Sequence, residues 1–333
     1  MCLVQEKFMS MARDRLEQLS LADPELAERV ELVEGDVTES GLGLNPDAES
    51  RAREAAGIWH LAAAYDLSVA REVGMRVNVE GTRRVLELAA RCSDLDRFHY
   101  VSTCYISGRY AGVFSEEDLE KGQEFNNFYE ETKFLAEVEV RSATRGGLPT
   151  TVYRPAIVVG DSRTGETQKY DGPYYIIRWI LRQPGTALVP VAGDPDAARV
   201  NLVPSDFVID AMAHLSLLPH ASGRTYQLAD SDPLTVTRFL EVIGRATGKK
   251  VRTVPVPGRS LKWAINRIPG VYRLTGVPSA AVDYFAHPTH YATQHATTDL
   301  AGSGVTVPAL ATYADRLVRY MRTHPEVARK GMT

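Results

Sequence analysis

The stretch FHYVSTCYISG, residues 98–108, decides the fold. Its first half is short, aromatic and β-branched, and its second half is a polar turn that ends in a glycine, so we predict a buried strand at 98–102. The segments on either side, 77–91 and 128–143, are rich in Ala, Leu, Glu and Arg at helical spacing. A strand between two helices is one unit of a β-α-β arrangement.

The same alternation continues outward in both directions. We predict further strands at residues 2–4, 30–33, 58–61 and 150–153, and further helices at 8–20 and 46–56. Regular alternation of this kind predicts an α/β fold, namely a doubly wound parallel sheet with helices on both faces. After residue 160 the sequence becomes richer in polar residues and glycine, which predicts loops. Further on, a predicted strand at 200–203, a helix at 205–217 and a strand at 225–228 indicate that the chain returns to the sheet.

Composition excludes several classes of protein. The 333 residues are 44% hydrophobic and 24% charged, which is typical of a globular protein and excludes disordered and fibrous classes. Thirty-eight basic and 42 acidic residues give a net charge of −4, and no Lys/Arg block marks a nucleic-acid site. No apolar run approaches the ~18 residues that a membrane helix needs, and the amino terminus has no export signal.

The three cysteines are far apart in the sequence. Cys2, Cys92 and Cys104 form no CxxC pair. We therefore expect neither a disulfide framework nor a thiolate metal site, and we expect a reducing compartment, the cytoplasm.

One element of a dinucleotide-binding sheet is missing. Such sheets begin with a strand, a glycine-rich turn and a helix whose amino end binds the pyrophosphate. Here Gly41-Leu-Gly43 follows the second visible strand and lacks the third glycine, while Gly146-Gly147 precedes a strand. We interpret Met1 as the start of what would be the second strand, with the first β-turn-α unit absent. The chain is then an incomplete reading frame or fragment, or else a protein with an altered cofactor site.

The residues with the clearest chemical signal are Tyr129 and Lys133, in the sequence YEETK. Their spacing of four places a phenol and an ammonium on one face of a predicted helix. Alone, the pair does not distinguish a catalytic site from two ordinary side chains on a helix surface. The strand that ends in Ser102-Thr103 strengthens the signal, because its carboxyl end lies at the sheet edge where open α/β folds bind ligands.

Together these motifs resemble a known family. The YxxxK pair, the strand ending in Ser-Thr, HLAA at 60–63 and NVEGT at 78–82 resemble an extended short-chain dehydrogenase/reductase. The segments YRPAIVVGDSRTG at 153–165 and NLVPSDFV at 201–208 are similar to its thioester-reductase and fatty acyl-CoA reductase branch, the male sterility NAD-binding type. The resemblance covers nearly the whole chain, but lacks the glycine-rich turn. It also departs at Gln5, where the branch often has an arginine that favours NADP.

The resemblance implies a division of the chain and a reaction. Residues 1–160, completed by about 198–230, would form the dinucleotide-binding domain, and 161–197 with 231–333 the substrate-binding region. The activity implied is NAD(P)-dependent reduction of an acyl thioester, bound to CoA or a carrier protein, or of a related carbonyl. The cofactor would be NADP or NAD, with NADP favoured.

The resemblance also implies roles for individual residues. Thr103, Tyr129 and Lys133 would be catalytic: Thr103 polarises the carbonyl and Tyr129 donates a proton to the oxyanion. A free phenol has a pKa of about 10, so we expect the Lys133 cation to lower the pKa of Tyr129. The predicted cofactor contacts, besides Tyr129 and Lys133, are Asp36 and Val37 at the adenine, Leu61, Ala62 and Ala63 at the adenosine, Pro155 and Ala156 at the nicotinamide, and Asn78 and Ser102.

Several alternatives remain open at this point. The chain is alternatively a nucleotide-sugar epimerase or dehydratase of the wider family, or a non-catalytic relative without a phosphate loop. Tyr170, Tyr174 and Tyr175 either line an acyl pocket or pack in the core. The three histidines of HPTHYATQH, starting at His287, are interpreted as loop or pocket-rim residues rather than metal ligands, because Pro288 interrupts any helix that would align them.

Overall fold

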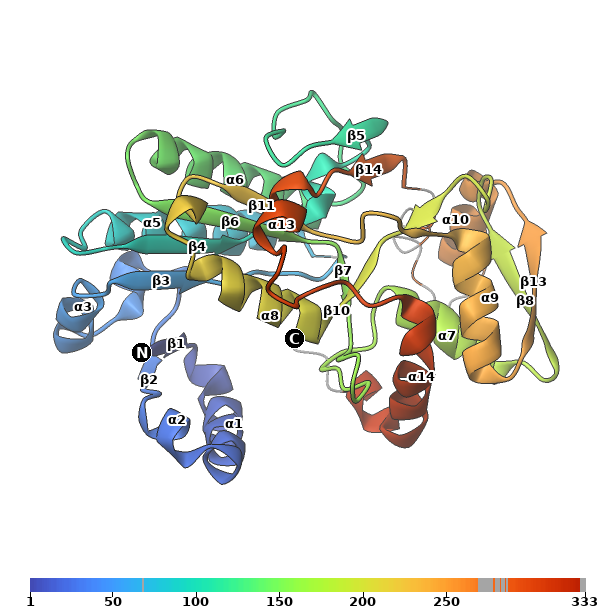
Figure 1. The fold of residues 1–333 in the computed structure, drawn as a ribbon, viewed down its shortest axis with the longest axis horizontal. Coiled ribbons are helices and arrows are strands. Elements are labelled where there is room, and N and C mark those ends of the chain that lie inside the picture. Colours follow the sequence, from blue (N-terminus) through green and yellow to red (C-terminus); the bar gives the residue numbers. More distant parts are fainter. Residues whose placement is uncertain (68, 269–277, 279–281, 283–284, 286, 330–333) are drawn as a thin grey trace.

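The structure is a computed structural model that describes residues 1–67, 69–268, 278, 282, 285 and 287–329 (Figure 1). A part of the predicted substrate region 231–333 therefore lies outside the described residues. Within the described part of the chain, no helix combines the length and apolar character needed to cross a bilayer.

A parallel sheet of four strands forms the centre of the molecule. Its strands lie in the order β11-β6-β4-β3 and are β3 (Gly57–His60), β4 (Arg97–Val101), β6 (Thr150–Pro155) and β11 (Thr225–Leu228). Every residue of β6 and β11 is buried, as expected for strands covered on both faces. This confirms the predicted doubly wound α/β fold.

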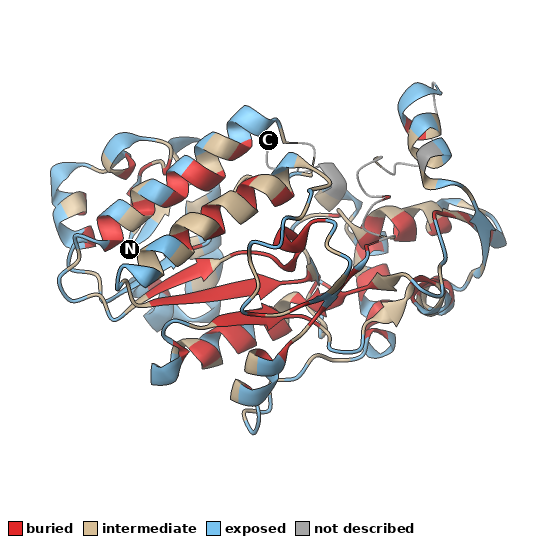
Figure 2. Cartoon of the chain, turned by 90° about the horizontal axis from the view of Figure 1, so that it is seen from above, coloured by how far each residue is buried: buried red, intermediate tan, exposed pale blue. Residues whose placement is uncertain are grey.

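Side chains that alternate along the strands bind helices on opposite faces. Phe98 and Tyr100 of β4 pack on α5 (Gly81–Ala89) and α6 (Phe128–Arg145). Tyr153 of β6 packs instead with α8 (Ser205–Ser216). Figure 1 shows α5 and α6 above the sheet and α8 below it, and in Figure 2 the helices turn their buried faces toward the strands.

The amino-terminal strands form a separate sheet. β1 (Cys2–Val4) pairs in parallel only with β2 (Leu32–Glu34), and the pair lies beneath β3 in Figure 1. The longer of the two α-helices between them, α1 (Met9–Ala22), has no buried residue. Among the described residues, β1 and β3 each have one edge without a strand partner.

The carboxyl-terminal half adds smaller parallel pairs. β7 (Ile157–Val159) pairs with β10 (Leu202–Pro204), and β8 (Thr186–Val191) pairs with β13 (Lys250–Pro255). The predicted return to the main sheet is correct for β11 but wrong for residues 200–203. Only Ala156 separates β6 from β7, so the chain bends out of the main sheet there and β10 pairs with β7 instead.

A second core forms around the helices of this half. Side chains of α7 (Pro173–Arg182), α9 (Val236–Thr247) and α14 (Ala314–Thr323) pack together with β8. Tyr170 and Tyr174 are buried in this core, which supports the packing alternative for them.

The remaining elements are short. They are η1 (Glu6–Phe8), α2 (Pro24–Glu28), η2 (Ser40–Gly43), α3 (Pro46–Ala52), α4 (Arg71–Gly74), η3 (Met75–Glu80), η4 (Cys104–Ser107), β5 (Gly112–Phe114), β9 (Arg199–Val200), η5 (Pro219–Ala221), β12 (Leu234–Thr235), α10 (Gly258–Arg267), β14 (Thr289–Tyr291), α13 (Gln294–Asp299), η6 (Leu310–Thr312) and η7 (Pro325–Arg329).

Candidate active site

Thr103 is held at the carboxyl end of β4. Its backbone is extended, and its Oγ1 accepts a hydrogen bond from the Tyr105 amide at 3.2 Å, which caps η4. The same hydroxyl donates to the Pro155 carbonyl at the end of β6, at 3.4 Å. Gly108 ends this turn with a φ of 52°, and a Cβ there would lie 2.2 Å from the Glu124 carbonyl oxygen, so the turn requires glycine.

Tyr129 lies in the first turn of α6, which Asn127 caps by accepting a hydrogen bond from the Glu130 amide at 3.0 Å. Burial raises the pKa of Tyr129 to about 12, although a side-chain hydrogen bond with Thr103 opposes this rise. The structure therefore brings together the two side chains predicted to bind the reacting carbonyl. The expected fall in the pKa of Tyr129 is wrong for the chain without cofactor, because burial outweighs the favourable contacts.

Lys133 is only 3% exposed and is directed toward β4. Its Nζ donates to the Val101 carbonyl at 2.7 Å and to the Tyr100 hydroxyl at 3.0 Å, and it lies 4.5 Å from the centre of the Tyr100 ring. Burial lowers the pKa of Lys133 to about 7, and the negative charge of Glu137 acts against this shift. Near neutral pH, Lys133 is therefore close to equal populations of its charged and neutral forms.

A buried ion pair lies one helical turn beyond Lys133. Glu137 and Arg154 are fully buried, with 2.6 Å between Oε1 and Nη2. Burial raises the pKa of Glu137, but Arg154 outweighs it and holds the pKa below its usual value. Arg154 also donates to the carbonyls of residues 115, 116 and 118, so it ties that loop to the sheet. We did not predict this pair, although an arginine directly after the predicted strand at 150–153 and before the apolar residues 155–159 was a usable signal.

Ser102 belongs to this ion-pair network. Its Oγ donates to Glu137 Oε2 at 2.5 Å, and the residue is buried. The side chain that we predicted to contact the cofactor is thus directed into the core in this structure.

Asn78 holds the loop that follows β3. Its Oδ1 accepts from the Ala64 amide at 2.7 Å and its Nδ2 donates to the Ala64 carbonyl at 3.1 Å. The Nδ2 also donates to Thr132 on α6 at 3.0 Å. Asn78 is thus buried and positions residues 61–66 relative to α6.

A cavity of about 750 Å³ lies next to this loop. It adjoins the carboxyl ends of β1, β2 and β3, and it is lined by Gln5, Glu6, Lys7, Phe8, Asp36, Thr38, Ala63, Ala64, Tyr65, Asp66, Val69, Val73, Arg76, Val77 and Lys169. Of the predicted cofactor contacts, Asp36 and Ala63 are in this lining. Val37 is buried in the core, Leu61 and Ala62 are exposed, and Pro155 and Ala156 are buried at the end of β6.

The floor of the cavity is polar. Asp36 accepts hydrogen bonds from Gln5 Nε2 at 2.8 Å and from the Thr38 amide at 2.7 Å. Burial raises the pKa of Asp36, but these bonds and the Arg76 charge outweigh it, so the pKa is below its usual value. Gln5, the position at which the resemblance expects an arginine, lines this cavity, and Arg76 is a lining residue that we did not single out from the sequence.

Lys169 lines this cavity and carries a positive charge to its edge. Its Nζ lies 3.8 Å from Asp66 Oδ2, 3.5 Å from Asp171 Oδ2 and 4.7 Å from the centre of the Tyr65 ring. The loop that carries Lys169 and Asp171 therefore packs beside the loop that follows β3.

Two of the three histidines of HPTHYATQH have hydrogen-bond partners within the protein. His287 Nε2 lies 2.7 Å from the Tyr291 hydroxyl, and His295 Nδ1 lies 3.0 Å from the Thr225 carbonyl. In the described part of the chain, no group of three or more His, Cys, Asp or Glu residues could hold a metal ion.

A parallel doubly wound sheet, a Tyr-x-x-x-Lys helix and a cavity at the strand ends define an NAD(P)-binding oxidoreductase of the extended short-chain dehydrogenase/reductase type. Comparison with known families makes this specific. The family described as male sterility protein matches residues 1–212, and the chain belongs to this family.

Its relatives include reductases and reductase domains. A linear gramicidin synthase of Brevibacillus parabrevis is 28% identical over 68% of this chain, and glycine betaine reductase ATRR of Emericella nidulans is 28% identical over 75%. The crystal structure of the terminal R domain from the myxalamid PKS-NRPS pathway has a TM-score of 0.81 and 27% identity. That match covers 97% of this chain and 84% of the R domain. The chain spans only 4% and 19% of the two curated relatives.

Proposed function

We propose that this chain catalyses the NADPH-dependent reduction of an acyl thioester. The observation that carries the proposal is the side-chain hydrogen bond between Thr103, at the carboxyl end of β4, and Tyr129, in the first turn of α6. The R-domain likeness supports a thioester carbonyl as substrate, bound to CoA or to a carrier protein.

The cavity fits the adenosine half of a dinucleotide. Ala63 and Ala64 have small side chains that allow close approach, and Asp36 offers a carboxylate that can accept a hydrogen bond from the adenine amino group. Arg76 and Lys7 line the same cavity and supply cations for a 2′-phosphate, which favours NADP although Gln5 stands where an arginine is usual. We assign the remaining contacts at the nicotinamide to Pro155 and Ala156.

When bound, the nicotinamide supplies the hydride to the carbonyl carbon. The Thr103 hydroxyl donates a hydrogen bond to the carbonyl oxygen, and Tyr129 transfers its phenolic proton to the same oxygen as negative charge develops there, which gives a hemithioacetal. Return of this proton to the Tyr129 phenolate re-forms the carbonyl as the C–S bond breaks, and the aldehyde and the thiolate are released. A phenol with a pKa of about 12 holds its proton at neutral pH, so Tyr129 starts in the form that can donate. The Lys133 cation, one turn along α6, stabilises the phenolate that remains.

The division of labour between regions follows from this placement. Residues 1–160, with about 198–230, hold the cofactor and the triad, and 161–197 with 231–333 cover the substrate. The second region contacts the first at several places, among them the Lys169–Asp66 ion pair and the pairing of β14 with β5.

The test measures NADPH oxidation with an acyl-CoA and with an acyl N-acetylcysteamine thioester. We expect Tyr129→Phe to lower kcat at least 100-fold, since a lost proton donor costs about 10²–10⁴. Tyr313→Phe is the matched control, because its buried hydroxyl has no hydrogen-bond partner among the described residues. A wild-type chain that folds but binds neither NADPH nor NADH would instead support the non-catalytic alternative.

A further inference from the structure

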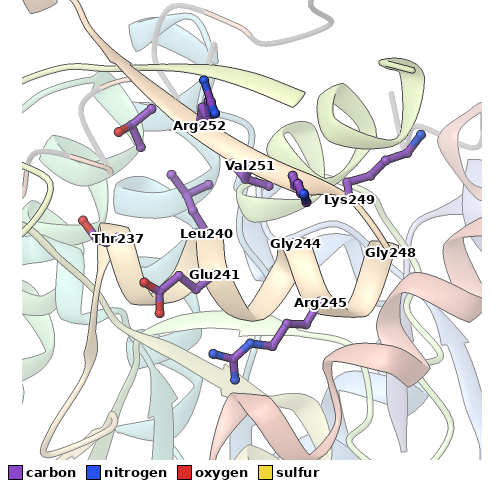
Figure 3. A pocket seen from close by; sticks show the side chains of 11 residues that line it. Thr237, Leu240, Glu241, Gly244, Arg245, Gly248, Lys249, Val251 and Arg252 are labelled. Atoms are coloured by element: carbon purple, nitrogen blue, oxygen red, sulfur yellow. The ribbon is translucent and has the colours of Figure 1, made fainter. Parts of the chain in front are cut away.

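A second hollow lies far from the triad in the sequence, between α9 and β13 (Figure 3). Its volume is about 600 Å³. Its lining residues come from these two elements and the turn between them: Thr237, Leu240, Glu241, Gly244, Arg245, Gly248, Lys249, Lys250, Val251, Arg252 and Thr253. We call this hollow the α9/β13 groove.

The groove runs along the edge of β13. Side chains of a strand alternate between its two faces, so a hollow lined by five consecutive residues, 249–253, must follow the edge of the strand. From α9 the lining residues recur every three or four positions, which is one stripe of a helix. Val251 packs against this helix, since its Cγ2 would lie 3.1 Å from a Cβ on Gly244.

The edge that faces the groove has no strand partner among the described residues. β13 pairs only with β8, residue for residue from Lys250 to Pro255. The Val256 amide donates to the Val191 carbonyl on the β8 side. Because backbone groups alternate sides along a strand, the amides and carbonyls of Val251 and Thr253 point to the open edge. Pro255, which has no N–H, ends this row of donors.

The groove belongs to a basic stretch of an acidic chain. Residues 242–282 contain eight Arg or Lys and no Asp or Glu, while the whole chain has a net charge of −4. Arg245, Lys249, Lys250 and Arg252 line the groove and form no ion pair within the described residues. Glu241, the single acidic lining residue, is already paired with Arg238 at 2.8 Å.

We propose that the α9/β13 groove binds an extended acidic segment of a partner protein, which adds to β13 as a further strand. An open strand edge beside a helix accepts such a segment through main-chain hydrogen bonds, and side-chain pockets give specificity. Four unpaired cations attract carboxylates on the added strand.

The same charges argue against a second copy of this chain as the occupant. Pairing β13 with β13 would bring Lys250 and Arg252 of both copies together, and like charges on paired strands are destabilising. An acidic segment would instead place carboxylates opposite these cations, and opposite charges on paired strands are stabilising.

The experiment uses three fluorescein-labelled peptides with the full chain. The first alternates Glu and Val over six residues, the second alternates Lys and Val, and the third is the acidic peptide with every backbone amide N-methylated, which removes all of its backbone N–H donors and keeps its charge. Fluorescence anisotropy gives the Kd. Hydrogen exchange reports protection of the Val251 and Thr253 amides.

The variant Lys250→Glu/Arg252→Glu tests the groove. Its control is Arg13→Glu/Arg29→Glu, which makes the same charge change at exposed positions on and after the amino-terminal helices. We expect the acidic peptide to bind, its Kd to rise at least tenfold in the groove variant but not in the control, and both amides to gain protection.

Three results would overturn the proposal. The Lys/Val peptide binds as well as the acidic one, which would exclude charge selection, or the N-methylated peptide does, which would exclude strand addition. The acidic peptide does not bind at all. The chain dimerises through β13, shown by a dimer that the groove variant loses, which would make a second copy the occupant.

Discussion

Lys133 lies one helical turn before Glu137 on α6, and both side chains are buried. Burial favours the neutral amine of Lys133, whereas the carboxylate of Glu137 favours its cation. Arg154 in turn holds Glu137 in its charged form. The charge of the proposed catalytic lysine is therefore controlled by a pair that does not line the strand-end cavity.

The first prediction concerns the pH dependence of activity. The pKa of Lys133 is about 7, so the cation is present below this pH and is lost as the pH rises through it. If the cation stabilises the Tyr129 phenolate, kcat/KM, which reports on the free enzyme, falls as the pH rises above about 7. Lys133→Met lowers kcat/KM and removes its fall above pH 7, which we call the alkaline limb of the pH profile. A wild-type profile that stays flat from pH 6 to pH 9 would contradict the assigned role.

The second prediction is that Glu137→Gln moves this limb to lower pH. Removing the carboxylate leaves burial unopposed, so the pKa of Lys133 falls further. The variant also loses stability, by about 3–5 kcal/mol, because Arg154 keeps a buried charge without its partner.

A double variant separates these two effects. Glu137→Gln with Arg154→Met removes the unpaired cation, so we expect it to recover part of the free energy of unfolding. It keeps the shifted pH limb only if Glu137 acts on Lys133 through its charge. Recovery of the wild-type limb would show that the shift came from misfolding.

The third prediction concerns acid stability. Burial lowers the pKa of His60 to about 3, and of His99 and His287 to about 4. The unfolded chain binds these protons near pH 6.5 and the folded chain only near pH 3 to 4, so the contribution of these histidines to stability falls as the pH falls below about 6.5. Each proton contributes about 1.4 kcal/mol per pH unit. Chemical denaturation from pH 7 to pH 5 measures the slope, and His60→Gln reduces it by one proton.

The fourth prediction concerns the choice of cofactor. Arg76→Ala removes a cation from the strand-end cavity, so we expect the Kd for NADPH to rise about tenfold, the equivalent of about 1.4 kcal/mol, with little change for NADH. Arg84→Ala on α5 serves as the control, because Arg84 does not line the cavity. Equal losses for both nucleotides would show that Arg76 does not bind a 2′-phosphate. Titration of nucleotide fluorescence gives both constants.

The sequence by itself determined the doubly wound arrangement and the helix face shared by Tyr129 and Lys133. Both follow from local sequence patterns: apolar residues that recur every two positions indicate a strand, and those that recur every 3.6 positions indicate a helix. Membership of the reductase branch followed from short motifs such as YRPAIVVGDSRTG, which the family match confirms.

Only the tertiary structure decided the ionisation of Tyr129 and Lys133, because burial depends on what the rest of the chain packs around them. It also decided that the Ser102 hydroxyl bonds to Glu137, 35 residues away, and that Gln5 and Asp36 meet in one cavity. The tertiary structure also decided that one edge of β13 has no strand partner among the described residues, because a second partner would come from chain segments far away in sequence.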